Sequence, residues 1–411
     1  MEAHNEITPH GARLTFSLSA QVPVQAYVLA GPARVIIDLP DVNFQIDPQE
    51  GEQGPQKPGR KNHGKTARQS ADLIASYRFG ALAPGKSRIV VDLNRPAKIV
   101  AAQCAPLDSS GVAQLTLELA ADTEAEFKLA ARDGSERQIK LGSPAPELPN
   151  AAPPAVQSKP VIVLDPGHGG VDVGAMGRQH AVEKAVVLDF AKTLATQLRA
   201  SGQYKVVMTR DDDTFVPLGE RVRIARRQGA ALFVSIHADT LSGGGDNVQG
   251  ATVYTVSDRA SDAEAARVAE SENKADAAAG VETKEEAGDV NDILFDLTRR
   301  ETRAYSHVFA HSLTQYWKVA ARLNKNPARS AGFVVLKAPD VPSVLLELGY
   351  LSNDQDAAQL TSPVWRDKAA EQVAHAIDAF FAPRLPSNAP KAASAPLAAQ
   401  NAPKRAENAN P

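Results

Sequence analysis

Short runs of alternating hydrophobic and polar residues fill the N-terminal third of the chain. In Arg13–Ser19 the apolar residues fall at every second position, which is the period of a half-buried β-strand. Similar runs lie at Gln25–Leu29, Arg34–Leu39, Ser87–Leu93, Ala97–Val100, Gln114–Leu119 and Glu126–Leu129. Short strands separated by turn residues predict a small β-sandwich over residues 1–142. The likeness of RVIIDL at Arg34–Leu39 to RIVVDL at Arg88–Leu93 suggests a duplicated half.

Residues 159–384 have a different pattern, in which strand-like and helix-like segments alternate. The predicted strands are Val161–Leu164, Lys205–Thr209, Leu232–Ile236, Ala251–Val256, Gly332–Leu336 and Val344–Glu347. The predicted helices are Val182–Ala200, Leu218–Gln228, Val290–Leu323 and Val364–Phe381. This order predicts an α/β domain with a mixed, mostly parallel sheet covered by helices.

Three further segments are predicted to lie outside the packed domains. Residues 143–158 are rich in proline and alanine and predict a linker. Residues 385–411 predict a disordered tail, and Asp47–Ser70, which is rich in Gly, Pro, Gln and Lys, predicts a solvated loop. Contact of that loop with anionic polymers is the alternative.

The composition of the chain limits the partners it can bind and the residues that can form a metal site. The formal net charge of −3 argues against a nucleic-acid partner. No apolar stretch reaches the roughly 18 residues of a transmembrane helix. Cys104 is the single cysteine, so no intramolecular disulfide can form and a metal site has to use histidine and carboxylate ligands.

Ionisable residues follow three of the predicted apolar strands. His168 comes after Val161–Leu164 in the turn DPGHGG, His237 ends the strand Leu232–Ile236, and Glu347 ends Val344–Glu347. Ligands of such folds gather at the carboxyl ends of strands. Glu183 begins the helix after the first turn, so its side chain can face the same edge. Each residue alone has an ordinary structural reading, but their common placement favours a site.

Two imidazoles and one carboxylate, with a fourth position open to water, form a catalytic zinc pattern. We therefore predict His168, Glu183 and His237 as zinc ligands and Glu347 as the general base. Asp165 is predicted either to hold the turn or to orient an imidazole by contacting the ring nitrogen that does not bind the metal.

Other groups fit a site less well. His307 and His311 have the i, i+4 spacing of zinc-binding histidines, but Val308 stands where the metalloprotease motif has its glutamate. We expect both to be ordinary helix residues. His180 follows no strand, and the three glycines Gly243–Gly245 lack the Lys-Ser/Thr of a phosphate-binding loop.

At these residues the sequence resembles a known family. The segments DPGHGG at Asp165–Gly170, SIHA at Ser235–Ala238 and ELGYLSN at Glu347–Asn353, together with Glu183, are similar to the zinc N-acetylmuramoyl-L-alanine amidases of the Amidase_3 type. The resemblance implies zinc on His168, Glu183 and His237, catalysis by Glu347, and hydrolysis of the amide that joins N-acetylmuramic acid to L-alanine. The N-terminal β region is similar to the AMIN domain, which binds peptidoglycan and directs such amidases to the division site.

The resemblance also suggests how activity is controlled. The segment 259–300 is rich in Ala, Glu, Asp and Lys, and by itself predicts a solvent-facing helical pair. In division amidases an inserted helix covers the active site and one of its glutamates takes the open zinc position. Glu270 is our first candidate for that glutamate and Glu272 the second. A LytM-domain activator protein would then release the helix.

Alternative functions with the same ligands are a zinc peptidase or carboxypeptidase acting on wall peptides, and a non-catalytic wall-binding protein. The resemblance implies a monomer that is exported to the periplasm, where the substrate lies. Met1–Glu6 lacks the basic and apolar regions of a signal peptide, so we expect that the signal was trimmed or that the start was misassigned.

Overall fold

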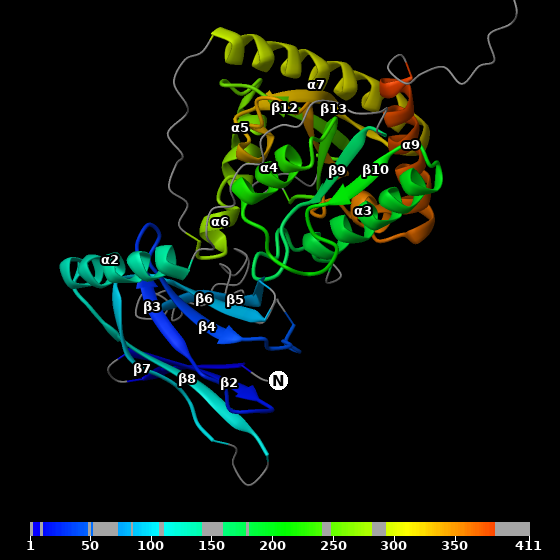
Figure 1. The fold of residues 1–411 in the computed structure, drawn as a ribbon. Helices are drawn as coiled ribbons and strands as arrows, with labels where there is room; N and C mark the ends of the chain where they lie inside the picture. Colours follow the sequence, from blue (N-terminus) through cyan, green and yellow to red (C-terminus); the bar gives the residue numbers. More distant parts are fainter. Residues whose placement is uncertain are drawn as a thin grey trace, which may run out of the picture.

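The structure is a computed structural model with two domains, an N-terminal β-sandwich and a C-terminal α/β domain (Figure 1). It describes residues 3–8, 11–47, 51, 73–83, 85–106, 111–141, 159–177, 181–240, 248–281 and 293–382. The predicted linker, the predicted tail, almost all of the loop Asp47–Ser70, His180 and Gly243–Gly245 lie outside the described residues.

Two four-stranded antiparallel sheets form the N-terminal domain, in the orders β1-β2-β8-β7 and β3-β4-β6-β5. Their strands are β1 (Ala3–Thr8), β2 (Gly11–Leu18), β3 (Gln25–Leu29), β4 (Arg34–Pro40), β5 (Ile74–Ala83), β6 (Lys86–Leu93), β7 (Ala97–Cys104) and β8 (Ala113–Ala121). Inward side chains of both sheets, such as Leu14, Phe16, Ile37 and Val91, share one hydrophobic core. The predicted sandwich is confirmed, with β1 and β5 as strands that the sequence analysis did not predict.

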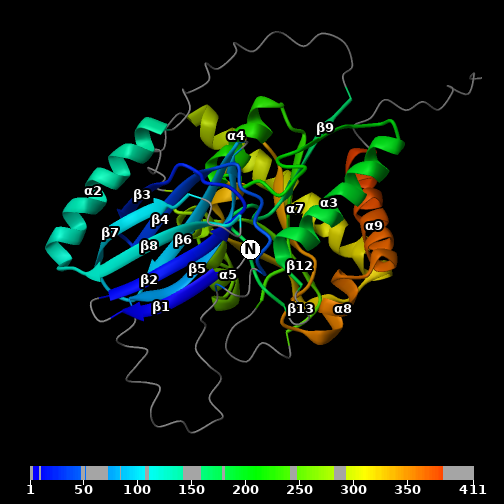
Figure 2. The same ribbon diagram turned by 90° about the horizontal axis from the view of Figure 1, so that it is seen from below.

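The strand predicted at Glu126–Leu129 is wrong, because these residues belong to helix α2 (Glu124–Leu141). Thr123 starts the helix by accepting a hydrogen bond from the backbone N–H of Glu126 and donating its hydroxyl to the Glu126 carboxylate. Phe127 and Ala131, four residues apart, are buried against the sandwich core. Figure 2 shows α2 lying along one side of the sandwich.

The two similar sequences RVIIDL and RIVVDL become the neighbouring strands β4 and β6 in the middle of one sheet. Because the strands run antiparallel, Arg34 lies opposite Asp92 and Asp38 lies opposite Arg88. The Arg88 guanidinium reaches Asp38 across the pair at 2.6 Å. The repeat therefore places arginine and aspartate at both ends of one strand pair.

The C-terminal domain is a six-stranded sheet in the order β10-β9-β11-β14-β12-β13. The strands are β9 (Val161–Pro166), β10 (Lys205–Met208), β11 (Leu232–His237), β12 (Ala251–Val256), β13 (Leu323–Ala331) and β14 (Ser343–Glu347). β10, β9, β11 and β14 are parallel, whereas β12 is antiparallel to β14. This confirms the predicted mixed, mostly parallel sheet.

Helices cover both faces of this sheet (Figure 1). They are α3 (Glu183–Ala200), α4 (Leu218–Arg227), α5 (Ala263–Glu272), α6 (Ala275–Ala278), α7 (Ile293–Ala320), the 3₁₀ helix η4 (Val334–Leu336), α8 (Asp354–Leu360) and α9 (Pro363–Phe381). Ile162 and Leu164 pack with α3, α7 and α9, while Val163 packs with α4 and α5 on the other face. Alternate residues of a central strand thus serve two cores, as expected of a sheet buried on both sides.

The strand predicted at Gly332–Leu336 is also wrong, because Val334–Leu336 form η4 and the edge strand is β13. Short apolar runs do not distinguish a strand from another buried segment. β13 has the polar sequence LNKNPARSA, and Pro327 within it is compatible with an edge strand, where one side needs no ladder hydrogen bonds.

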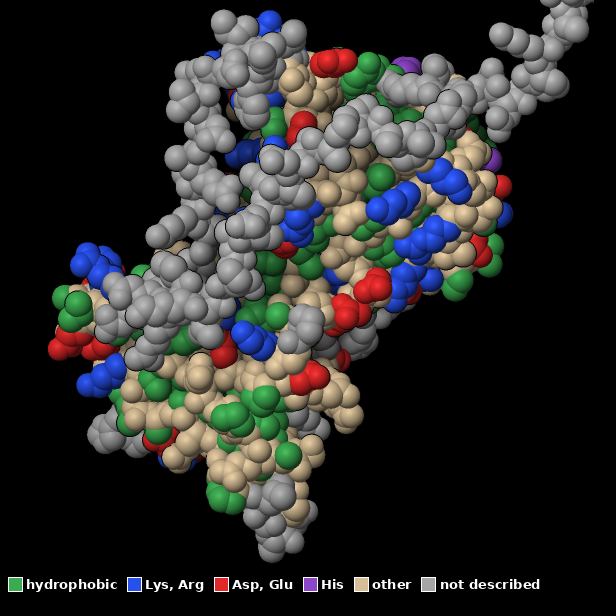
Figure 3. All heavy atoms as spheres, in the orientation of Figure 1, with side chains coloured by type: hydrophobic (Ala, Val, Ile, Leu, Met, Phe, Trp, Pro, Cys, Tyr) green, Lys and Arg blue, Asp and Glu red, His purple; other side chains and the backbone are tan. Residues whose placement is uncertain are grey.

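The distribution of charge on the surface and the hydrophobicity of the helices agree with the composition of the chain. Basic and acidic side chains lie side by side over the C-terminal domain in the view of Figure 3. Among the helices that the structure describes, none combines the length and hydrophobicity needed to cross a bilayer.

The packing of α7 against α3 and α9 gives a stability prediction. Trp317 is fully buried, and its ring centroid lies 6.4 Å from that of Phe190 and 6.0 Å from that of Trp365. We expect Trp317→Ala to lower the free energy of unfolding by about 3–5 kcal/mol, because it leaves a large cavity. Val319, which is 77% exposed on the same helix, provides the control, since Val319→Ala should change it by less than about 0.5 kcal/mol. Urea denaturation followed by circular dichroism measures both, and equal losses would contradict this account of the core.

Candidate metal centre and active site

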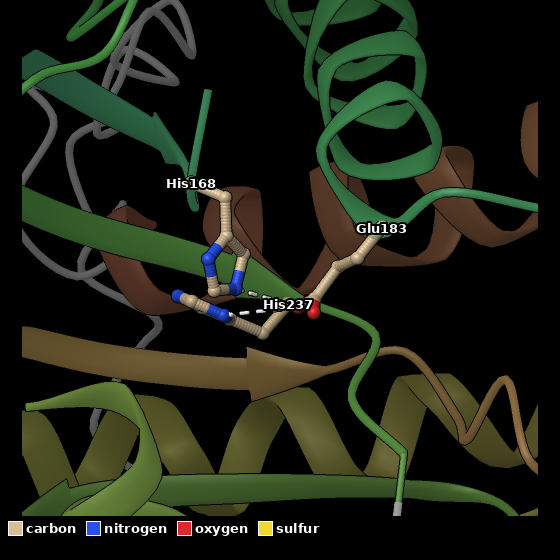
Figure 4. Close-up of side chains that lie close together, drawn as sticks. All are labelled: His168, Glu183 and His237. Carbon is tan, nitrogen blue, oxygen red and sulfur yellow. Dashed lines mark hydrogen bonds and ion pairs between the residues drawn. The ribbon is translucent and has the colours of Figure 1, made fainter. Parts of the chain in front are cut away.

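The structure brings His168, Glu183 and His237 together at the carboxyl ends of β9 and β11 (Figure 4). One ligand atom from each lies within 4.8 Å of the others. Glu183 Oε1 is 3.2 Å from His168 Nε2 and 3.1 Å from His237 Nδ1. All three residues are buried, so the group is arranged as metal ligands would be.

His168 enters this centre from a sharp turn after β9. It adopts a positive φ of 58°, which is uncommon for a residue other than glycine, and the next two residues, Gly169 and Gly170, also have positive φ values. Gly167 lies against the ring of His237, where a Cβ would come within 2.4 Å of Cε1. The glycines of DPGHGG therefore allow the two imidazoles to lie with ring centroids 4.9 Å apart.

Two buried arginines hold this turn through its backbone carbonyls. Arg221 of α4 donates to Pro166 O at 2.8 Å and to His168 O at 2.7 Å. Arg210 donates to Gly167 O at 2.7 Å and to Pro166 O at 3.0 Å. Sequence reasoning missed both residues. The available signal was that Arg221 lies on the buried face of α4 with Leu218 and Ala225, at helical spacing.

Asp165 anchors the start of the turn. It accepts hydrogen bonds from Thr209 at 2.6 Å and Ser235 at 2.7 Å, and it pairs with Arg221 at 2.9 Å. Of the two roles predicted for Asp165, these contacts match holding the turn. Burial alone would raise the pKa of Asp165, but the Arg221 charge and the two hydroxyls outweigh it and lower the pKa below its usual value.

The residue that orients an imidazole is Asp172, which the sequence analysis did not identify. Its carboxylate lies 2.9 Å from His168 Nδ1, so the Nε2 atom of the same ring faces the centre. Glu183 is held in the same way, since its carboxylate accepts hydrogen bonds from the N–H groups of Ala175 and Ala238, both at 2.8 Å. The side chains of His168 and Glu183 are thus oriented by contacts within the protein.

Glu347 lies beside His237, because β11 and β14 pair in parallel with these two residues in register. Its Oε2 accepts a hydrogen bond from the N–H of Asp239 at 3.2 Å, while Oε1 is buried without a hydrogen-bond partner among the described residues. Burial and the carboxylates of Asp239, Glu183 and Glu272 raise the pKa of Glu347 well above its usual range.

Negative charge is in excess at this centre. Burial, with the charges of Glu272 and Glu183, raises the pKa of Asp239 to about 7. Burial by itself lowers the pKa values of the two histidines, yet the surrounding carboxylates raise them above the usual value, well above it for His168. These shifts show that the carboxylates favour positive charge between them.

The inserted segment contributes Glu272, not Glu270, to this centre. Glu272 is buried, and its Oε2 lies 3.1 Å from His237 Nδ1 and 3.5 Å from His168 Nε2. Glu270 is exposed and pairs with Lys274 at 2.7 Å. Our first candidate is therefore wrong and the second has the contacts. The reason is the helical period, because α5 buries Ala265, Val268, Ala269 and Glu272 on one face and Glu270 points away.

The alternative histidine pair lies elsewhere. His307 and His311 are exposed residues of α7, and His307 Nδ1 lies 3.5 Å from the hydroxyl of Thr255. Both are thus ordinary helix residues, as expected.

The Asp165–Arg221 pair predicts a pH-dependent loss of stability. Because the folded pKa of Asp165 is depressed, its stabilising contribution is present above the unfolded pKa of about 3.9 and is lost as the pH falls through the folded pKa. Arg221→Met leaves a buried unpaired carboxylate, so we expect unfolding free energy at pH 7 to fall by about 3–5 kcal/mol. The difference from the unsubstituted protein should shrink toward pH 4 as Asp165 takes up a proton.

Arg223→Met on the same helix is the control, because Arg223 makes a partly exposed pair with Glu220 and should cost less than about 1 kcal/mol. Chemical denaturation at several pH values measures these differences. A loss for Arg221→Met that does not vary with pH would contradict the assigned charge state of Asp165.

Sequence relatives share most of the length of this chain. It is 31% identical over 378 residues to N-acetylmuramoyl-L-alanine amidase AmiC of an Escherichia coli O6:H1 strain, which covers 90% of this chain and 86% of the relative. It is 32% identical to AmiC of Neisseria meningitidis serogroup B, again over 90% and 86% of the two chains. Amidase AmiA of Escherichia coli K12 is 40% identical over 224 residues, which are 54% of this chain and 76% of AmiA.

Family models match both domains. The AMIN domain model matches residues 3–119, which include the whole sandwich of strands except the end of β8. The N-acetylmuramoyl-L-alanine amidase model, Amidase_3, matches residues 162–379, which contain His168, Glu183, His237 and Glu347. The chain therefore belongs to the N-acetylmuramoyl-L-alanine amidase family and carries an N-terminal AMIN domain.

Proposed function

We propose that this peptidoglycan amidase uses zinc held by His168, Glu183 and His237 to cleave the amide between N-acetylmuramic acid and L-alanine. The observation that carries the proposal is the convergence of three buried ligand atoms within 4.8 Å, beside Glu347 on the next strand. The AmiC relatives and the AMIN domain support a role in wall remodelling and daughter-cell separation, in the periplasm after export.

The residues present fit a zinc ion. His168 Nε2 is buried and makes no hydrogen bond within the described residues, so its lone pair is available to a metal. The donor set of two imidazoles and one carboxylate is typical of catalytic zinc. A divalent cation at this point would also offset the excess negative charge of the surrounding carboxylates.

When bound, zinc would polarise the scissile carbonyl and lower the pKa of the attacking water, so that this water loses a proton more readily. In this proposal Glu347 accepts a proton from that water, because it lies in register beside His237 on the neighbouring strand and its buried Oε1 atom has no hydrogen-bond partner among the described residues. The same carboxyl group then donates the proton to the leaving amine of L-alanine.

Glu347→Gln separates catalysis from metal binding. The amide cannot take up a proton, so we expect release of stem peptides from purified sacculi to fall about 10²–10⁴-fold. Zinc content, measured by elemental analysis, should stay near one ion per chain, whereas His168→Ala should lose both zinc and activity. Chelation should abolish activity and added zinc should restore it. Activity of Glu347→Gln near that of the unsubstituted enzyme would remove Glu347 from its role.

We further infer that helix α5 inhibits the resting enzyme through Glu272. Its carboxylate lies within 3.5 Å of both histidines, at the position where the attacking water is needed. Burial, together with the charges of Glu183 and Asp172, raises the pKa of Glu272 although the two histidines lower it. An activator of the LytM-domain class that draws α5 away would leave the centre open to substrate.

Glu270 and Glu272 form a matched pair for testing this inhibition. We expect Glu272→Ala to raise basal activity on sacculi at least about fivefold, because the competing carboxylate is removed. Glu270→Ala, which changes an exposed residue two positions away, should leave it unchanged. Both variants should bind zinc. Basal activity of Glu272→Ala equal to that of the unsubstituted enzyme, at equal zinc content, would count against inhibition.

A further inference from the structure

We propose that the AMIN domain holds the inhibitory segment closed by binding the backbone that follows helix α5. This inference rests on the proposed inhibition by Glu272. The surface concerned is the sheet β3-β4-β6-β5, and the segment that occupies it is Ala277–Gly280, at the end of α6. Figure 1 shows α6 between this sheet and the α/β domain.

Three arginines of this sheet donate to four successive carbonyls of the segment. Arg34 of β4 binds Ala277 O, and Arg78 of β5 binds Ala278 O at 2.8 Å. Arg88 of β6 binds Ala279 O at 3.3 Å and Gly280 O at 2.9 Å. Because the contacts are made to backbone atoms, they recognise the conformation of the segment and not its side chains.

The arginines also make contacts within the AMIN domain. Arg78 pairs with Asp92 at 2.6 Å, and Arg88 pairs with Asp38 at 2.6 Å and donates to the hydroxyl of Tyr27 at 3.0 Å. Arg34 and Arg88 are almost completely buried. Guanidinium groups fixed in this way lose little conformational entropy on binding, so the site is preorganised.

Apolar contacts complete the surface. Ala279 is fully buried in a cluster with Leu29, Ile36 and Val90 of the AMIN sheet. Gly280 has φ of 66°, which favours glycine, and a Cβ there would lie 2.4 Å from Ile36 Cδ1, so a larger residue would displace the end of the Ile36 side chain.

The contact is close enough along the chain to control Glu272. Glu272 ends α5, and α6 begins three residues later. The carbonyls of Ala277–Gly280 that the arginines bind therefore lie within eight residues of Glu272. Asp276 of α6 also accepts the N–H of Leu218 at 2.8 Å, which ties the segment to the catalytic domain. The AMIN domain further contacts the turn after His168, where Val171 N–H donates to Ala81 O at 3.3 Å. Withdrawal of α5 together with α6 therefore requires the arginine contacts and the Asp276 contact to break.

The test compares arginine-to-methionine changes in the full chain. We expect Arg34→Met and Arg78→Met, alone and together, to raise basal activity on sacculi, the double variant at least about fivefold. Arg13→Met is the matched control, because Arg13 lies on the other sheet in an exposed pair with Glu118 and should leave activity unchanged. Adding Arg34→Met and Arg78→Met to Glu272→Ala should give no further rise, since the group they release is already absent.

Hydrogen exchange provides a readout that does not depend on turnover. Amides of Ala263–Ala278 should exchange faster in the double variant than in the unsubstituted protein or in Arg13→Met, with the melting temperature reporting that the chain is folded. If exchange and activity of the double variant are unchanged while Glu272→Ala raises basal activity, the proposed restraint of α5 by the AMIN domain is wrong. If Glu272→Ala does not raise basal activity but the double variant exchanges faster, the restraint by the AMIN domain is supported and inhibition by Glu272 is rejected.

Discussion

The active site depends on how the turn Asp165–Gly170 is held at the end of β9. Asp165 is tied to β11 and α4 through Ser235 and Arg221, and Arg210 and Arg221 together bind three carbonyls of the turn. This network fixes His168, whose other nitrogen is held by Asp172. A metal site requires side chains that are already oriented. The buried hydrogen bonds of Asp165, Arg210, Arg221 and Asp172 all fix the position of His168.

The same centre explains why inhibition from within the chain is possible. Buried carboxylates crowd two imidazoles, and the geometry that suits a metal also admits a further carboxylate from α5. In the proposed inhibition, Glu272 takes the position that catalysis leaves open, and control acts by moving α5 and the segment that follows it.

The AMIN domain then has two surfaces to consider. One sheet, β3-β4-β6-β5, faces the catalytic domain and binds the end of α6, while the other, β1-β2-β8-β7, lies on the far side of the sandwich (Figure 1). Wall binding and restraint of α5 can therefore be joined in one small domain. The internal likeness of β4 and β6 has a structural consequence here, since it supplies Arg34 and Arg88 to the same interface.

Local sequence patterns were enough to predict the two fold classes and to group the residues at the strand ends. Periodicity and apolar runs depend on neighbouring residues, and the carboxyl ends of parallel strands meet at one edge, so His168, His237 and Glu347 could be grouped without coordinates. Three-dimensional packing was needed to choose Glu272 over Glu270, to identify the contacts of Arg210, Arg221 and Asp172, and to place the AMIN domain on α6. These depend on which helix face is buried and on contacts between residues far apart in the chain, and a local pattern of residues does not carry that information.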